Sequence, residues 1–342
     1  MTAHLPVAFR GVRLHVVTGK GGTGKTTVAA AFALALARGG QRVLLVEVEG
    51  RQGIAQVFDI PPLGLDEVRV LADAGGGELW ALSVDAKAAL LEYLQTFYKL
   101  GRAGSALEKV GAIDFATTIA PGVRDVLLIG KVYEAVGRTA GSRRGHGDLV
   151  WDAVVLDAPP TGRIGRFLNV NAEVADIARV GPIRNQADSI TRLLRSPRTA
   201  VHLVTLLEEM PVQETVDAVA EIGGLGMPLG AVVVNMVREA LLTQDELDAL
   251  AAAETDPAAR QFLVTTVTTD LDSVGVRTST SLADRLLTQA HDHAERLTLE
   301  GEQQELLAAT GLPVVHLPYL ADGVEEGGLS TLATVLTEED LA

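Results

Sequence analysis

One nine-residue stretch, Gly19–Thr27, constrains the fold of this chain more than any other part of its 342 residues. It reads Gly-Lys-Gly-Gly-Thr-Gly-Lys-Thr-Thr and follows an apolar run, residues 14–18, that predicts a strand. The apolar run 28–37 comes after it, and residues 26–38 predict a helix. A glycine-rich loop between a strand and a helix is typical of a phosphate-binding loop. Its main-chain N–H groups turn towards phosphate oxygens, and the helix N-terminus points at the same anion.

The side chains of this stretch add a more specific prediction. The stretch fits the pattern G-x-x-x-x-G-K-[ST], in which Lys25 reaches the β- and γ-phosphates of a nucleoside triphosphate and Thr26 binds Mg²⁺. Lys20 is a second lysine, directly after the first glycine. It can neutralise the phosphates of a partner across a dimer interface, as an arginine finger does in trans. The expected nucleotide-binding residues of the loop are Gly19, Gly21, Gly22, Thr23, Gly24, Lys25, Thr26 and Thr27.

The same glycines also satisfy the dinucleotide pattern G-x-G-x-x-G. Glu47 and Glu49 end the next predicted strand, about where an acid that binds a ribose would lie, so a nicotinamide-dependent oxidoreductase is an alternative. Two features favour the triphosphate. Lys25-Thr26 follows the last glycine, where a dinucleotide site needs neither a cation nor a hydroxyl. Asp157 ends a later apolar strand, where a Mg²⁺-binding acid is expected.

The rest of the chain alternates short apolar runs with longer helical segments, which predicts an α/β fold. Most of the apolar runs are continuous, as in parallel strands covered on both faces. We therefore expect a doubly wound, mostly parallel sheet of about seven to eight strands with P-loop topology. We expect a single domain over residues 1–342, with a helical insertion at about 86–140 and a helical block at about 239–310. The predicted strands are residues 14–18, 43–48, 79–84, 153–156, 201–206, 231–234 and 314–317.

Composition excludes several functions. With 29 basic and 44 acidic residues the net charge is −15, which argues against binding nucleic acid or an anionic membrane through a general positive field. The chain has no Cys, so thiolate zinc sites and cysteine-ligated iron–sulfur clusters are not expected. The first residues lack the apolar core of a signal peptide, and the acidic end differs from a basic amphipathic tail. We expect a cytoplasmic protein without a direct membrane anchor.

Three segments together resemble one family. The phosphate-binding loop, residues 46–53 and Asp157–Gly162 (Asp-Ala-Pro-Pro-Thr-Gly) are similar to those of the arsenite-pump (ArsA) and tail-anchored-protein targeting ATPases, with MinD and ParA as more distant relatives. The resemblance spans about residues 12–335. It implies a Mg²⁺-dependent ATPase with a deviant P-loop. Such an enzyme works as a dimer, of identical chains or with a paralogue, and acts on a client or partner protein. A nucleotide-gated binding module with little turnover remains an alternative.

The resemblance assigns roles to further residues. Asp157 resembles the acid that holds Mg²⁺ through water. Glu49 stands where the family has an Asp that orients the attacking water, and its extra methylene suggests slow hydrolysis. Asn235 resembles the asparagine that bonds the adenine, and Pro318 resembles a proline on the other side of the base.

Two loops resemble the family's nucleotide-sensing switches. Pro159, Thr161 and Gly162 resemble the second switch, whose main chain senses the γ-phosphate. In the first switch, Arg51 and Gln52 have no family counterpart, so we expect exposed loop residues there.

Overall fold

The computed structural model describes residues 11–48, 50–72, 75–89, 121–140, 148–170, 172, 182–277, 280–324 and 327–338. They belong to two compact units. The first unit contains the sheet and takes its residues from 1–206, 210–237 and 307–342. The second consists of residues 207–209 and 238–306.

The first unit is built on a sheet of eight strands in the order β3-β4-β2-β5-β1-β6-β7-β8. Every neighbouring pair is parallel except β3 with β4. The predicted doubly wound, mostly parallel sheet is therefore confirmed. The strands are β1 (Leu14–Gly19), β2 (Arg42–Glu47), β3 (Val68–Leu71), β4 (Glu78–Ser83), β5 (Ala153–Asp157), β6 (Thr199–Thr205), β7 (Leu229–Val237) and β8 (Val314–Pro318).

The central strands are covered on both faces, as their continuous apolar sequences predict. In β5, Ala153 and Val155 pack in one cluster with α1 (Lys25–Arg38), while Val154 and Leu156 are fully buried as well. Successive side chains of a strand point to opposite faces, so both faces of this sheet carry a core.

Helix α1 is enclosed to an unusual degree. All ten residues from Val28 to Ala37 are buried, between the sheet and the helix α14 (Gly328–Glu338). Six of the ten are Ala, whose small side chain lets neighbouring elements approach closely. At its end, Arg38 donates to the main-chain oxygen of Ser330 at 3.0 Å and to its hydroxyl at 2.6 Å.

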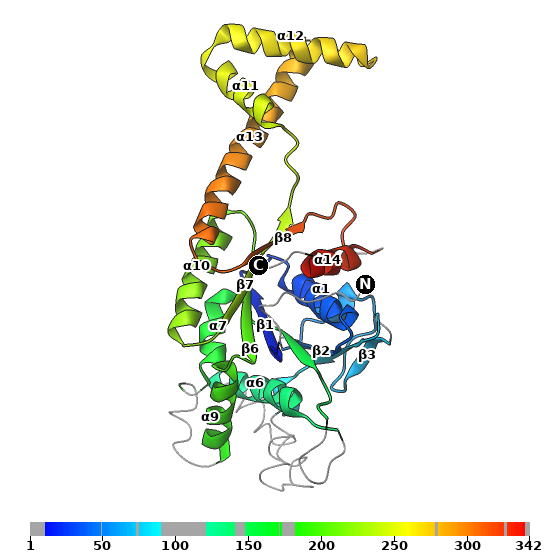
Figure 1. Ribbon diagram of the computed structural model, residues 1–342, viewed down its shortest axis with the longest axis vertical. Coiled ribbons are helices and arrows are strands. Elements are labelled where there is room, and N and C mark those ends of the chain that lie inside the picture. The colour runs from blue at the N-terminus through cyan, green and yellow to red at the C-terminus, as the bar shows by residue number, and fades with distance from the viewer. Residues whose placement is uncertain are drawn as a thin grey trace. The chain divides into compact units, whose positions relative to one another are not determined.

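The remaining described helices of the first unit flank the same sheet (Figure 1). Among them, α6 packs on β5 and α7 on β1. Residues 90–120 of the predicted insertion lie outside the described residues, which include its last helix, α6. The helices are α2 (Gly53–Val57), α6 (Pro121–Gly137), α7 (Thr161–Leu168), α9 (Pro182–Leu194) and α10 (Glu209–Gly224).

The second unit consists of helices α11 (Gln244–Thr255), α12 (Pro257–Ser273) and most of α13 (Thr280–Ala308). These helices lie within the predicted helical block. Thr243 and Glu246 form a capping box that starts α11, and Asp256 caps α12. The interpretation of the whole chain as one domain stays a prediction. Within the described ranges, every helix is too short or too polar to span a lipid bilayer.

Candidate functional site

The phosphate-binding loop connects β1 to α1, and its shape depends on glycine. Gly24 caps α1 with φ +84°, and a Cβ atom there would lie 2.4 Å from the side-chain nitrogen of Asn235. At Gly19 a Cβ would lie 2.1 Å from the main-chain oxygen of Val204 on the neighbouring strand β6. A side chain at either position would displace the loop from the end of the sheet.

The loop's own polar groups hold its two ends together. The Lys25 ammonium donates to the main-chain oxygen of Lys20 at 3.0 Å, and the hydroxyl of Thr23 donates to the same oxygen at 3.0 Å. An ammonium on a long side chain can exchange this carbonyl for a phosphate oxygen. The loop therefore keeps Lys25 beside the place where its N–H groups and the α1 N-terminus favour an anion.

Thr26 and Asp157 meet beside this loop. The Thr26 hydroxyl donates to a carboxylate oxygen of Asp157 at 2.7 Å, because β1 and β5 are parallel neighbours with Val17 opposite Asp157. A hydroxyl and a carboxylate are oxygen ligands of the kind that Mg²⁺ prefers. They border a cavity of about 290 Å³ lined by Gly22, Gly24, Lys25, Thr26, Thr27, Glu47, Arg51, Asp157 and Ala158.

Glu47 reaches the same cavity, but its carboxylate is occupied by the main chain. It is 2% exposed and accepts hydrogen bonds from the N–H groups of Gln52 at 2.8 Å and Ile54 at 3.2 Å. These two hydrogen bonds to Glu47 hold the main chain of the loop after β2 in its observed shape. The catalytic candidate Glu49 lies outside the described residues.

Of the two residues expected at exposed loop positions, Arg51 is exposed and Gln52 is not. Gln52 is half-buried, and its amide exchanges two hydrogen bonds with the main chain of Leu63, at 3.1 and 2.7 Å. Arg51 is exposed but lines the cavity of the phosphate-binding loop. Neither contact could be read from spacing, because both depend on how the loop folds back.

The two adenine candidates lie at the ends of neighbouring strands. Pro318 of β8 is opposite Val237 of β7, two residues beyond Asn235. Asn235 is 5% exposed and donates to the main-chain oxygen of Thr23 at 2.9 Å, so it also clamps the phosphate-binding loop. That second contact was not anticipated from the sequence. The contact with adenine stays a prediction.

A carboxylate that could not be anticipated from the sequence joins the loop to the segment that resembles the second switch. Glu214 of α10 lies 2.9 Å from the Lys20 ammonium and accepts a hydrogen bond of 2.9 Å from the Thr161 hydroxyl. The hydrogen bond from Lys20, and to a lesser degree that from Thr161, lowers the pKa of Glu214 below its ordinary value. Near it, the Thr18 hydroxyl donates to the main-chain oxygen of Pro159 at 2.7 Å. Glu214 carries no local motif, since its partners are distant in the chain.

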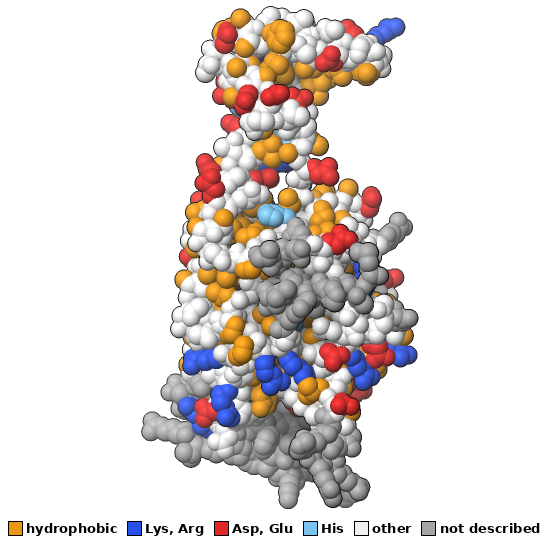
Figure 2. Space-filling model, in the orientation of Figure 1, with side chains coloured by type: hydrophobic (Ala, Val, Ile, Leu, Met, Phe, Trp, Pro, Cys, Tyr) orange, Lys and Arg blue, Asp and Glu red, His pale blue; other side chains and the backbone are white. Residues whose placement is uncertain are grey.

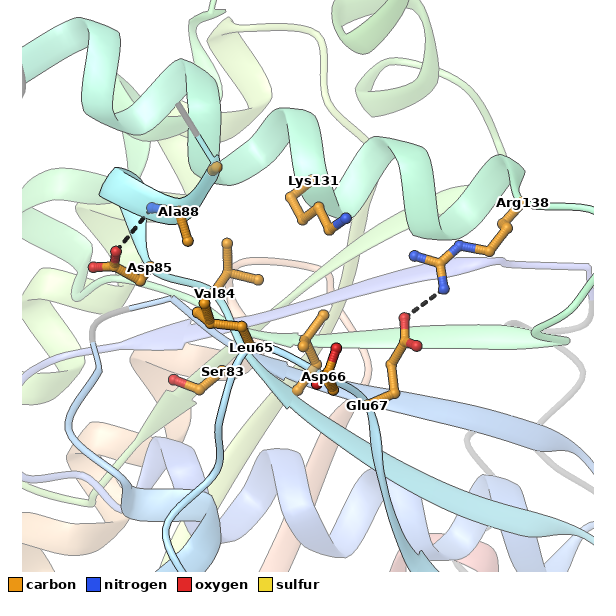
Figure 3. Close-up of a pocket in the computed structure, with 11 residues that line it drawn as sticks. Leu65, Asp66, Glu67, Ser83, Val84, Asp85, Ala88, Lys131 and Arg138 are labelled. Carbon is orange, nitrogen blue, oxygen red and sulfur yellow. Dashed lines mark hydrogen bonds and ion pairs between the residues drawn. The ribbon is translucent and has the colours of Figure 1, made fainter. Parts of the chain in front are cut away.

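A second cavity, of about 380 Å³, lies between α6, the end of β4 and the residues that precede β3 (Figure 3). Lys131 points into it from α6, and Arg138 extends to Glu67 (Figure 3). Glu134 also bonds Arg138 and raises its pKa above the ordinary value. This cavity shares no lining residue with the phosphate-binding loop, so the smaller cavity is the candidate nucleotide site.

A mostly parallel sheet whose first strand leads into this loop defines a P-loop nucleoside triphosphatase. The family described as anion-transporting ATPase (ArsA ATPase) matches residues 12–196. The ATPase BagA of Mycobacterium tuberculosis is 48% identical over 334 residues, covering 98% of this chain and 95% of BagA. The arsenical pump-driving ATPase of Escherichia coli is 26% identical over 262 residues, covering 69% of this chain and 41% of that protein.

The chain belongs to the ArsA ATPase family and is an ATP-hydrolysing enzyme. Family membership decides in favour of hydrolysis over the two alternatives, an oxidoreductase and a binding module with little turnover.

Proposed function

We propose that this ATPase depends on Mg²⁺, works as a dimer in the cytoplasm, and couples ATP binding and hydrolysis to a partner protein. The observation that carries the proposal is the hydrogen bond of 2.7 Å between Thr26 and Asp157 beside the phosphate-binding loop. It brings a hydroxyl and a carboxylate oxygen together at one point of the cavity, which supports a Mg²⁺ site there. A Mg²⁺ site of this kind takes few protein ligands and fills the others with water and phosphate oxygens.

The residues of the loop take the binding roles. The main-chain N–H groups from Gly21 to Thr27 and the Lys25 ammonium bind the phosphates. Thr26 holds Mg²⁺ directly and Asp157 holds it through water. When bound, the ion neutralises negative charge on the phosphates. Asn235 and Pro318, at the ends of β7 and β8, hold the adenine from two sides.

Hydrolysis needs an oriented water and further positive charge. Water attacks the γ-phosphorus, the bond from that phosphorus to the β–γ bridging oxygen breaks, and ADP and phosphate result. Glu49 orients the water, and Lys20 of a second copy, or of a paralogue, neutralises the developing charge. The side chain of Lys20 is 28% exposed, which supports its reaching another chain.

Coupling to a partner is supported by apolar surface on the second unit. Leu241 is 79% exposed, Phe262 70% and Val274 73%, and hydrophobic side chains are visible on the surface of this unit (Figure 2). Where exposed apolar side chains form a contiguous patch, they mark surfaces that bind other proteins. We propose a protein with a complementary apolar surface as the partner. The net charge of −15 argues against a nucleic acid.

Phosphate release from ATP tests the site. We expect Lys25→Ala to lose ATP binding. We expect Asp157→Asn to bind ATP but to lose most turnover and its response to added Mg²⁺. Arg285→Ala removes an exposed cation on α13 of the second unit and should keep wild-type turnover. Wild-type Mg²⁺ dependence in Asp157→Asn would contradict the assigned site.

The dimer is tested by protein concentration. Turnover per chain should rise with the concentration of enzyme and level off once dimers dominate. Sedimentation with a non-hydrolysable ATP analogue and Mg²⁺ should show the dimer directly. Lys20→Ala should bind ATP and lose at least about tenfold in turnover, since a cation supplied in trans contributes far more than that in related enzymes. Full activity of Lys20→Ala would reject the trans role of this lysine.

A further inference from the structure

One carboxylate touches both the second lysine of the phosphate-binding loop and the second switch. Glu214 lies in the second turn of α10, 2.9 Å from the Lys20 ammonium and 2.9 Å from the Thr161 hydroxyl that donates to it. Thr161 is the first residue of α7 and is 5% exposed. It follows Asp157 by one short turn, Ala158–Pro160. The contacts of Glu214 therefore join α10, the loop and the segment after the Mg²⁺-binding acid.

The two contacts differ in how easily they break. The ion pair lies in partly open surroundings, with the side chains of Lys20 and Glu214 28% and 36% exposed. An ion pair of this exposure is weak, so the several negative charges of a triphosphate can compete for the lysine. The Thr161 hydroxyl is buried, and it donates a hydrogen bond to Glu214 of the same chain. Lys20 can therefore leave Glu214 while Thr161 stays.

We propose that Glu214 is a positioning residue for Lys20, which it holds on its own chain until the nucleotide of a second copy takes the lysine over. The inference rests on the proposed role of Lys20 in trans. Lys20 alternates between two partners, the Glu214 carboxylate in the separate chain and phosphate oxygens in the closed dimer. In the first state its charge is neutralised and its side chain is ordered against α10.

The exchange also reaches the second switch. When Lys20 departs, the Glu214 carboxylate loses its cation but keeps the hydrogen bond from Thr161. That bond then stabilises the negative charge of the carboxylate. A hydrogen bond to a carboxylate that has lost its cation is more strongly favoured. The turn from Ala158 to Thr161 is therefore held more firmly once the dimer has closed. The contact between Glu214 and Thr161 therefore couples the position of Lys20 to the conformation of the residues that follow Asp157.

Glu214→Gln tests the inference, because an amide of the same size can accept from Thr161 but cannot neutralise Lys20. Turnover is measured against enzyme concentration at saturating ATP and Mg²⁺. We expect half-maximal turnover at an enzyme concentration ~2- to 5-fold lower than for the wild type, since an exposed ion pair no longer opposes release of the lysine. Sedimentation with a non-hydrolysable ATP analogue should show the same shift of the monomer–dimer midpoint, and no shift without nucleotide.

Two further experiments test whether the shift comes from the contact between Glu214 and Lys20. Asp217→Asn removes an exposed carboxylate three residues further along α10, whose partner is Gln213, and should leave the midpoint unchanged. In the Lys20→Ala background, Glu214→Gln should have no effect on the midpoint. If Glu214→Gln does not fold, Glu214→Asp replaces it, since the shorter carboxylate cannot span from Lys20 to Thr161, and the same shift is expected.

Each result bears on one statement. An unchanged or raised midpoint in Glu214→Gln overturns the inference, and so does an equal shift in the Lys20→Ala background. Normal turnover of Lys20→Ala by itself overturns the proposed trans role instead. Asp157→Asn is measured beside these variants. Its loss of Mg²⁺-dependent turnover tests the nucleotide site independently of the role of Lys20 and of the inference about Glu214.

Discussion

The side-chain amide of Asn235 donates a hydrogen bond of 2.9 Å to the main-chain oxygen of Thr23, although the two residues are 212 positions apart. The bond ties the end of β7 to the middle of the phosphate-binding loop. Thr23 is 1% exposed and Asn235 5%, so water does not readily replace the amide. The loop is thus held from outside as well as by its own contacts between Lys25, Thr23 and Lys20.

Replacing Asn235 by Ala should loosen the loop and weaken ATP binding. The buried oxygen of Thr23 would lose its donor, which costs about 1–3 kcal/mol. We expect lower stability in urea unfolding and a higher KM for ATP. Asn235→Asp should be at least as harmful, because it places an acceptor against the same oxygen. An Asp variant with wild-type stability would show that the hydrogen bond contributes nothing.

Gly24→Ala should prevent nucleotide binding without any change in charge. The new Cβ would lie 2.4 Å from the Asn235 nitrogen, and φ +84° is strained for any residue with a Cβ. Nucleotide affinity, measured with a fluorescent ATP analogue, should fall below detection. Gly301→Ala is the control, because that glycine lies in α13 with nothing within 4 Å of an added Cβ and should tolerate or benefit from Ala.

Glu47 and Glu49 should respond differently to the same substitution. Glu47→Gln turns an amide N–H₂ group towards the N–H of Gln52 or Ile54, so a loss of about 1–3 kcal/mol of stability is expected. Glu49→Gln should keep the stability and lose turnover, as the proposed orientation of water requires a carboxylate. Thermal unfolding and phosphate release of both variants check this. Equal effects of the two changes on stability would reject the separation of roles.

A buried histidine pair should make the protein sensitive to acid. The N–H of Ala231 donates to Nδ1 of His202, whose Nε2 lies 3.2 Å from Nδ1 of His15. Burial lowers the pKa of His202 to about 4 and that of His15 well below its ordinary value, with His202 adding to the second effect. Both imidazoles are therefore neutral in the folded protein at neutral pH.

The sign of the pH dependence follows from these directions. In the unfolded chain both histidines take up protons as the pH falls through 6.5, whereas the folded His202 resists down to about pH 4. Stability is thus fully present above pH 6.5 and is lost between about pH 6.5 and 4, by about 3 kcal/mol for His202. Urea unfolding of His202→Gln at pH 7 and pH 5 should show a smaller loss than the wild type. Parallel losses would contradict this origin.

Much of the fold could be predicted because its signals are local. The seven strands expected from continuous apolar runs all form, and the loop lies between β1 and α1 as its spacing predicts. Strand β3 was missed. It is a short edge strand, Val68–Leu71, with Val68 and Arg69 exposed and an antiparallel partner, so it shows neither a continuous apolar run nor a strong alternation.

The positions of the candidate site residues could be predicted only where one short segment contains them, and their roles stay predictions. Gly24, Lys25 and Thr26 are consecutive in the chain, and Asp157 ends an apolar strand, so spacing alone indicates them. Glu214 was not predictable, since an acid on an amphipathic helix is ordinarily a solvated surface group. Its contacts with Lys20 and Thr161 depend on α10 lying beside two loops, which is a property of the packing of distant segments.

The enclosure of α1 has a consequence for how proteins of this kind can diverge. Ten consecutive positions from Val28 to Ala37 have no solvent-facing side, so each added methylene would force neighbouring strands or α14 to move, at about 1–3 kcal/mol. Natural variants should therefore accumulate few changes of volume along this stretch. Inherited differences between such proteins must arise elsewhere, on surfaces that can accept mutations without disturbing the helix that follows the phosphate-binding loop.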